Sequence, residues 1–273
     1  MAWPASTLNS WGQFVNRAAV LVSGAYPTPY MFRGQAAARW SLKPSLLRLL
    51  PADTTPATAL AVEKSLLENF RSEVHLHIPA GHLPQGFPAA QSPEWWALMQ
   101  HHGAPTRLLD WSMSPYVGAY FAVESDWDQD GAIFIVHAHA AQKSYVEHFG
   151  AEGKIKNETF LDPSAPTALL FWYPSRKSAR FVAQQGFTSL GTNVLSTHDD
   201  LIGPACQKAA EEQPGKLFHH KWIIPMALKP AFLRNLRAMN IAAHSLFPGL
   251  DGTCRSATEA ARLALTSCEP SGR

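Results

Sequence analysis

Residues 94–126, EWWALMQHHGAPTRLLDWSMSPYVGAYFAVESD, contain two helical patterns on either side of a short polar segment. Ser92, which precedes a proline, is expected to cap the first helix, and Gly103 is expected to end it. Ser114, also followed by a proline, repeats the start signal for a second helix that is apolar nearly all round, as buried helices are. We therefore expect residues 101–112 to form a loop between two anchored helices, a place where polar side chains often build a site.

Composition limits the kind of protein that this chain forms. Its 273 residues, 46% of them hydrophobic, suffice for one large domain or two small ones. The formal net charge is +2 with both signs scattered, so no basic stripe favours nucleic-acid binding. Three cysteines without short spacing argue for a reducing compartment and against a disulfide framework or zinc knuckle. The apolar run at 18–26 is too short to span a membrane, so we expect a cytoplasmic protein without a membrane partner.

Periodicity along the chain predicts an α+β fold. Helices are expected over residues 6–23 (capped by Ser6 or Thr7), 60–74, 229–240 and 254–265. Strands are expected over 30–35, 131–139 and 219–228, with a strand–turn–strand over 178–190, an irregular 140–175 and an insertion at 190–216. This pattern predicts a single domain over residues 1–273, with a helix-rich N-terminal half and a mixed or antiparallel β core in the C-terminal half.

Arg33 is the first candidate site residue, because it lies at the end of a predicted strand and precedes Gly34. A guanidinium held there offers a fork for a phosphate or carboxylate, and the glycine permits a turn or close approach of a ligand. The alternative is an arginine paired with an internal aspartate.

The central segment holds several more candidates. His101 with Asp110 makes an oriented general base, whereas His102 lies on the apolar face and suits a hydrogen-bonded core position. Arg107 and Asp110 are close enough in sequence to pair with each other. Adjacent histidines point to different sides of a helix end, so we expect no metal. Further candidates with both a structural and a ligand-binding reading are Thr106, Ser112, Trp111, Tyr120 and the amides of Gln184 and Gln185.

Several common enzyme classes lack their signatures here. We find no Walker loop, no Gly-x-Gly-x-x-Gly, no Gly-x-Ser-x-Gly and no His-Glu-x-x-His.

Four segments together resemble the FRG domain, a family of bacteria and phages named for its Phe/Tyr-Arg-Gly motif. They are Phe32-Arg33-Gly34, QHHGAPTRLLDWSMSPYVGAYFAVE (100–124), RFVAQQGFT (180–188) and SLFPGLDG (245–252). The resemblance covers about residues 9–260. One departure is Gly249, where family members usually carry an aspartate, although Asp251 remains.

A second resemblance, to toxins of the ADP-ribosyltransferase fold, implies a chemistry. Their first strand bears an aromatic-Arg pair that grips the phosphates of NAD, a Ser/Thr-rich segment leads into a helix, and a catalytic glutamate comes late. Here MFRG and TRLLDWSMSPYVGAYFA are similar to the first two parts, but residues 180–190 offer Gln184 and Gln185 and no glutamate. A carboxylate stabilises the oxocarbenium in that chemistry, so Glu124, Asp110 or Asp251 would have to replace it.

These resemblances lead us to expect a bacterial toxin or phage-defence enzyme that uses NAD as its substrate. Arg33 would bind the phosphates, and the residues around the ligand would be Gly34, Thr106, Arg107, Ser112 and Gln185. His101 or His102 would contact the ribose or the nicotinamide amide, and Trp111 or Tyr120 would form a wall beside the nicotinamide. Asp110 or Glu124 would supply the carboxylate. The acceptor, a protein or a nucleic acid, stays open, as does an antitoxin or partner subunit. The alternatives are a non-catalytic nucleotide- or protein-binding module and, more weakly, a nuclease using His101, His102 and Asp110.

Overall fold

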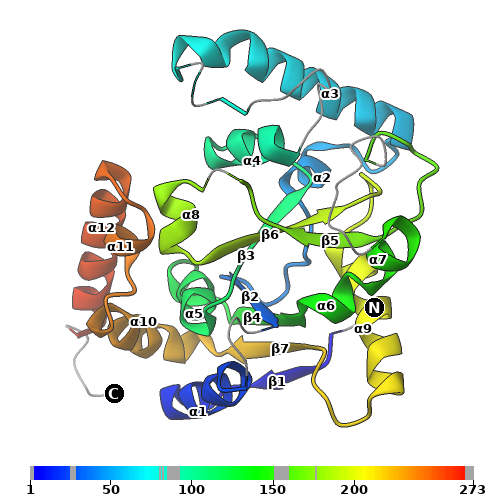
Figure 1. Cartoon of the computed structure of the whole chain (residues 1–273). Helices are drawn as coiled ribbons and strands as arrows, with labels where there is room; N and C mark the ends of the chain where they lie inside the picture. The colour runs from blue at the N-terminus through cyan, green and yellow to red at the C-terminus, as the bar shows by residue number, and fades with distance from the viewer. Residues whose placement is uncertain are drawn as a thin grey trace.

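One mixed sheet organises the chain in this computed structural model, which describes residues 3–24, 29–79, 81, 83–84, 93–150, 160–175 and 177–267. Seven strands follow the order β1-β7-β4-β2-β3-β6-β5 (Figure 1), and only the β1–β7 pair is parallel within the described ranges. The strands are β1 (Ala5–Thr7), β2 (Tyr30–Gln35), β3 (Leu108–Ser112), β4 (Gly131–His137), β5 (Leu169–Trp172), β6 (Gly186–Gly191) and β7 (His219–Ile224). The predicted α+β class is confirmed.

The helices cover both faces of this sheet and one of its ends. They are α1 (Trp11–Val22), α2 (Ser45–Leu49), α3 (Pro56–Glu73), α4 (Pro93–His101), α5 (Pro115–Val123), α6 (Ala138–Ala141), α7 (Lys143–Phe149), α8 (Ala179–Ala183), α9 (His198–Glu212), α10 (Lys229–Ala238), α11 (Ala243–Leu246) and α12 (Leu250–Ser267). Short 3₁₀ helices, η1 (Val74–Leu76) and η4 (Met226–Leu228), extend α3 and precede α10.

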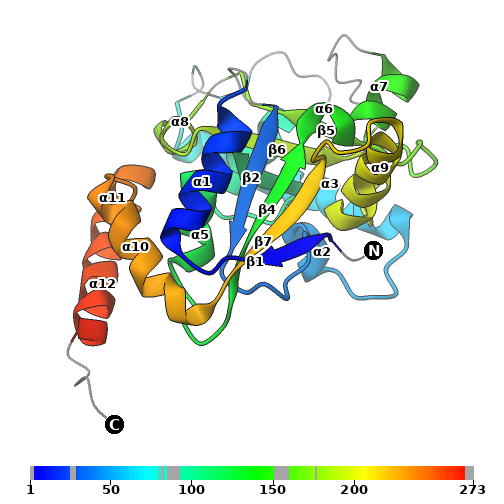
Figure 2. The same ribbon diagram turned by 90° about the horizontal axis from the view of Figure 1, so that it is seen from below.

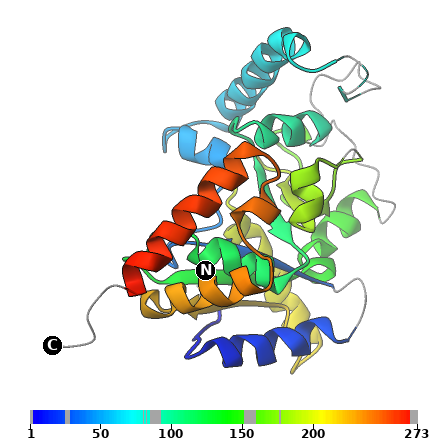
Figure 3. The same ribbon diagram turned by 90° about the vertical axis from the view of Figure 1, so that its left-hand side faces the viewer.

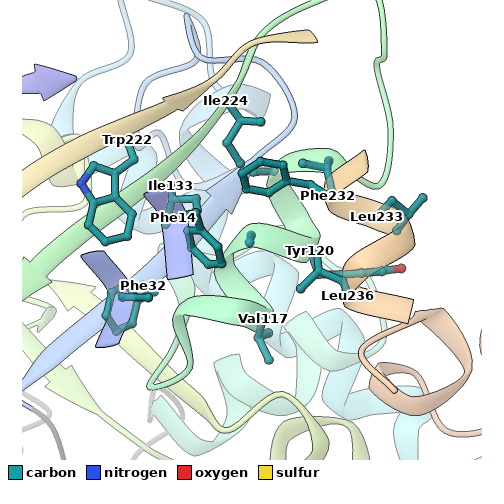
Figure 4. Close-up of a cluster of buried hydrophobic side chains, with 14 of the residues drawn as sticks. Phe14, Phe32, Val117, Tyr120, Ile133, Trp222, Ile224, Phe232, Leu233 and Leu236 are labelled. Atoms are coloured by element: carbon teal, nitrogen blue, oxygen red, sulfur yellow. The ribbon is translucent and has the colours of Figure 1, made fainter. Parts of the chain in front are cut away.

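The largest hydrophobic cluster lies where α1, α5 and α10 pack on β2, β4 and β7 (Figures 2 and 4). Phe14 of α1, Phe232 of α10 and Trp222 of β7 meet there, with ring centroids 5.5 and 6.1 Å from Phe14. The predicted all-round apolar helix is α5, and most of its residues are buried. Burial of these aromatic and aliphatic side chains is the main force that holds the central helix against the sheet.

A second cluster fills the opposite face, where α6 and α9 cover β4, β3 and β5. Every residue of β4 is buried, which confirms the prediction of a strand enclosed on both faces. Helices α3 and α4 make a third cluster with β5, β6 and Leu108 of β3.

The β2 and β3 strands meet at a single registered pair, Phe32 with Ser112. In contrast, β2 pairs with β4 along its whole length, and β3 pairs with β6 from Leu108 to Ser112. The sheet therefore consists of two well-paired groups of strands that diverge beyond this one junction.

Gly34 allows the central helix to approach this junction. A Cβ atom at Gly34 would lie 2.0 Å from the Gly118 carbonyl oxygen and 2.6 Å from the Ala122 nitrogen of α5. Close helix–strand packing therefore requires a glycine here, and the close approach of a ligand, which the sequence suggested, stays a prediction.

Several predicted elements are corrected by the structure. The expected loop 101–112 contains strand β3, and the expected first strand of 178–190 is helix α8. Residues 5–7 form β1, so the cap of the first helix is Ser10, whose Oγ accepts a hydrogen bond from the Gln13 N–H. The expected strand 131–139 ends at His137, and the expected irregular stretch 140–175 contains the end of α6, all of α7 and strand β5. The insertion forms α9 behind a Thr197–Asp200 capping box.

Strands and helices are also not segregated between the two halves of the chain, because β1, β2 and β3 precede residue 113 while α9 and α12 follow residue 197. Helices α10, α11 and α12 gather at one side of the molecule (Figure 3). Ser92, expected to cap α4, lies outside the described residues. Within the described ranges, none of the helices combines the length and the apolar composition that a membrane crossing requires.

Candidate functional site

Two adjoining cavities open where the β2 and β3 strands diverge. The larger, about 270 Å³, lies between α4, α8 and the β3–β6 pair, and the smaller, about 200 Å³, lies between β2, β3 and α5. Asp110, Trp111, Arg180 and Gln184 line both, so the cavities meet at these residues. Together they reach the lower end of the roughly 300–1,000 Å³ range of small-molecule sites.

Arg33 projects from β2 into this junction. Its Nη1 donates a hydrogen bond of 2.6 Å to the main-chain oxygen of Asp110 on β3. Its buried Nε has no partner among the described residues. Burial lowers the pKa of Arg33, an effect that the nearby Asp110 charge opposes. The guanidinium bridges the gap between the two strands and keeps donors available to a ligand.

Asp110 is the carboxylate that lies at the cavity junction. It is in contact with solvent, yet protein surrounds it closely enough that burial raises its pKa, against the lowering effects of Arg33 and Arg180. Its Oδ1 accepts a hydrogen bond of 2.6 Å from Gln100 Nε2 of α4. Thr106 Oγ1 in turn donates to Gln100 Oε1, which fixes the orientation of the amide. Thr106 therefore acts on Asp110 through Gln100 and does not line either cavity.

The two adjacent histidines have different positions. His101 lines the larger cavity, and burial together with His102 and Arg180 lowers its pKa. His102 is exposed and lines neither cavity, so the expected core position is wrong.

Arg107 lines neither cavity and instead forms a buried ion pair. It is 2% exposed, and its Nε and Nη2 donate to the two carboxylate oxygens of Glu63 in α3, with the Nε bond at 2.7 Å. The predicted Arg107–Asp110 pair is therefore wrong. Arg107 also donates 3.1 Å to the Thr192 carbonyl and lies 4.8 Å from the Trp96 ring centroid, so it joins α3, α4 and the end of β6.

Both of the predicted aromatic wall residues are buried. Trp111 is 3% exposed and donates 2.7 Å from Nε1 to Ser189 Oγ, which in turn contacts His198 Nδ1 at 2.7 Å. Tyr120 is buried and donates 2.6 Å to Glu259 of α12. Trp111 still lines both cavities, together with Phe181, Phe187, Phe32 and Phe121, whereas Tyr120 lines neither.

Glu124 is close to the Tyr120–Glu259 pair, because the Tyr120 hydroxyl also donates a 3.3 Å hydrogen bond to Glu124 Oε2. Burial raises the pKa of Glu124, and it lines neither cavity. Asp251 is exposed at the first turn of α12. Of the three predicted carboxylates, Asp110 is thus the one at the cavities.

The start of β6 supplies amides and an ordered turn. Ser112 lines the smaller cavity, and its Oγ donates a 2.7 Å hydrogen bond to the Gln184 carbonyl. The Gln184 side chain donates a 3.1 Å hydrogen bond to the Leu246 carbonyl. Gln185 is exposed with a φ of 47° and lines neither cavity. Its carbonyl accepts a 3.1 Å hydrogen bond from Met113 N.

Arg180 and Gln100 were not among the predicted site residues. The signal for Arg180 was its position in RFVAQQGFT, four residues before Gln184, which brings both side chains to one side of α8. No sequence feature pointed to Gln100, because its role is to hold Asp110, and Asp110 lies in strand β3, which the sequence did not predict. Within the described ranges, no group of three or more His, Cys, Asp and Glu side chains is placed to hold a metal ion.

Residues 28–131 match the family model described as the FRG domain. The matched segment includes Arg33, Asp110 and α5 and ends before α8 and β6. No curated protein and no solved structure matches the chain.

Proposed function

Because this chain carries an FRG domain, we propose that it is an enzyme of the toxin or phage-defence kind that cleaves NAD, as an ADP-ribosyltransferase or NAD glycohydrolase. The observation that carries the proposal is the meeting of two cavities at Asp110 and Arg180, with Arg33 in the wall of the smaller one. A dinucleotide has two ring systems joined by a negatively charged diphosphate, and this site has two cavities joined at a junction with two arginines.

The positions of the two segments that resemble ADP-ribosyltransferases, and of the late segment 180–190, support this reading. MFRG lies on β2, TRLLDWS leads through β3 into α5, and the late segment leads into β6. These strands are neighbours in the sheet, in the order β2-β3-β6. Segments that are distant in sequence thereby border the same pair of cavities.

Asp110 would provide the charge that the reaction requires. Cleavage of the bond between ribose and nicotinamide sends the bonding electrons to nicotinamide and leaves positive charge on the ribose. An ionised carboxylate held by Gln100 at 2.6 Å stabilises that charge without reorganising during the reaction. Water or another acceptor nucleophile then attacks the ribose carbon and loses its proton. Arg33 would bind the diphosphate.

Nicotinamide release tests this function. The purified protein is incubated with NAD, with and without cell extract as a source of acceptors, and free nicotinamide is measured. The wild type should release it, and Arg33→Ala should reduce release at least about 100-fold, because a charged contact to the diphosphate is lost. Arg39→Ala is the matched control, since Arg39 is exposed and lines neither cavity. If the folded wild type released no nicotinamide under either condition, the proposed enzymatic function would be refuted.

A second candidate function is a non-catalytic module that binds a nucleotide or a protein. The observation in its favour is the late segment, which offers Gln184 and Gln185 where the resembling toxins have a glutamate. The Gln184 amide is already used in a hydrogen bond to Leu246. This function would give NAD binding that depends on Arg33 and no product.

A further inference from the structure

Arg180 is a second guanidinium at the cavity junction. It comes from α8 and lines both cavities. Within the described residues, its guanidinium has neither a hydrogen bond nor an ion pair, and the contact that holds it is with an aromatic ring. The guanidinium carbon lies 4.6 Å from the centroid of Phe247. Its donors are therefore open on the cavity side.

Phe247 belongs to the C-terminal helices, between α11 and α12, and is 6% exposed. Arg255 of α12 contacts the same ring, with its guanidinium carbon 4.5 Å from the centroid. A guanidinium against an aromatic face keeps its donor edge free while its plane is fixed. The Phe247 ring thus orients the Arg180 guanidinium and leaves its N–H donors free to bind a ligand.

The junction therefore contains two arginines and one carboxyl. Arg33 donates one hydrogen bond to a main-chain oxygen, and its buried Nε has no partner within the described ranges. The Arg180 guanidinium donates no hydrogen bond to the described residues. Asp110 is within electrostatic range of both, but no ion pair joins it to either arginine in the described part of the chain. Charged groups enclosed by protein are costly unless they are paired, so this arrangement favours an anionic ligand.

We propose that Arg33 and Arg180 form a two-arginine clamp for a diphosphate, with Phe247 as the residue that positions Arg180. This inference rests on the proposed function in so far as the diphosphate belongs to NAD. It adds a binding residue and a positioning residue that both lie beyond the segment matched by the FRG model. The C-terminal helices then contribute to ligand affinity although they do not border the cavities themselves.

Titration calorimetry with inorganic pyrophosphate at low ionic strength tests the clamp independently of turnover. The wild type should bind pyrophosphate, and Arg180→Ala should weaken binding about 10- to 100-fold, as expected for loss of charged hydrogen bonds. Arg180→Lys should fall between them, because it keeps the charge but not the fork. Arg39→Ala should bind like the wild type. Unfolding midpoints confirm that each variant is folded.

Phe247→Leu tests the positioning role. It should weaken pyrophosphate binding several-fold in the wild type and leave the residual binding of Arg180→Ala unchanged, because the ring acts through Arg180. A general structural defect would instead weaken pyrophosphate binding equally in the wild type and in Arg180→Ala, which would remove Phe247 from the proposal.

With NAD, Arg180→Ala should raise KM more than it lowers kcat.

The outcomes separate this inference from the proposed function. Equal pyrophosphate affinity in wild type and Arg180→Ala would overturn the clamp, as would no binding by the wild type, even if nicotinamide is released. Arg180-dependent binding without nicotinamide release would leave the clamp in place and refute the enzyme.

Discussion

Arg33 on β2 donates a 2.6 Å hydrogen bond to the backbone carbonyl of Asp110 on β3, across the line where the two halves of the sheet diverge. The bond leaves the Asp110 carboxylate itself unpaired with Arg33. Both side chains therefore remain available at the cavity junction, and each can be altered separately.

Asp110→Asn should abolish most NAD turnover, by about 10²–10⁴-fold, without loss of the fold. Asparagine keeps the Oδ1 acceptor for Gln100 and removes the negative charge. Burial raises the pKa of Asp110, so wild-type activity should fall as the pH decreases through a value above the ordinary 3.8. Nicotinamide release measured against pH checks both points. Asp53→Asn, at an exposed position, is the control, and an active Asp110→Asn would rule out the carboxylate role.

Glu63→Gln should destabilise the protein by roughly 3–5 kcal/mol, because it leaves the Arg107 charge buried and unpaired. Urea unfolding measures this change. Glu68→Gln is the same substitution on the same helix, but its partner Lys64 is 3.7 Å away at the surface, so it should cost at most about 0.5 kcal/mol. Similar losses in the two variants would contradict the structural role of Arg107.

His198 should make the fold sensitive to acid. Burial, with the nearby Arg33 charge, lowers its pKa to about 3, below the ordinary value of 6.5. Between these values the unfolded chain binds a proton that the folded protein does not, so stability falls as the pH decreases from 6.5 towards 3. From pH 7 to pH 5, His198→Asn should lose about 2 kcal/mol less unfolding free energy than the wild type. His137, whose pKa burial lowers to about 4, contributes equally to both proteins. Equal losses would mean that His198 is protonated in the folded state.

Gly34→Ala should prevent α5 from packing on β2, because the added carbon would lie 2.0 Å from the Gly118 oxygen. Loss of the soluble folded protein, or a fall of several degrees in the thermal midpoint, is the expected result. Gly12→Ala on α1 is the opposite case. The nearest atom to its new carbon is 4.0 Å away, and alanine favours the helix by up to about 1 kcal/mol. A stable Gly34→Ala protein would require α5 to lie farther from the sheet.

The parts of the fold that follow from local sequence were predictable. The uninterrupted apolar run Gly131–His137 identified β4, and the proline-started apolar pattern identified α5. Strand β3 was hidden because its two polar residues, Asp110 and Ser112, stand among apolar residues on both faces, so no regular alternation marks it as a strand.

Long-range partners were the part that the sequence could not supply. Arg107 pairs with Glu63, 44 positions upstream, while its nearer neighbour Asp110 accepts a hydrogen bond from Gln100. Trp111 suited a ligand wall by composition, but the strand directs its indole to Ser189, 78 positions away. Arg33 and Asp110 were predicted as candidates, and it was the pairing of β2 with β3 that brought them together.

The separation of the site along the chain has a consequence for synthesis on the ribosome. A nascent chain that has emerged only to residue 131 contains Arg33 and Asp110 but lacks α8, β6 and Phe247. The wall that closes the larger cavity follows some fifty residues later, and the ring that orients Arg180 later still. A chain released before these segments have been made therefore has an open half-site, and the ligand-binding geometry forms only after residue 247 has emerged.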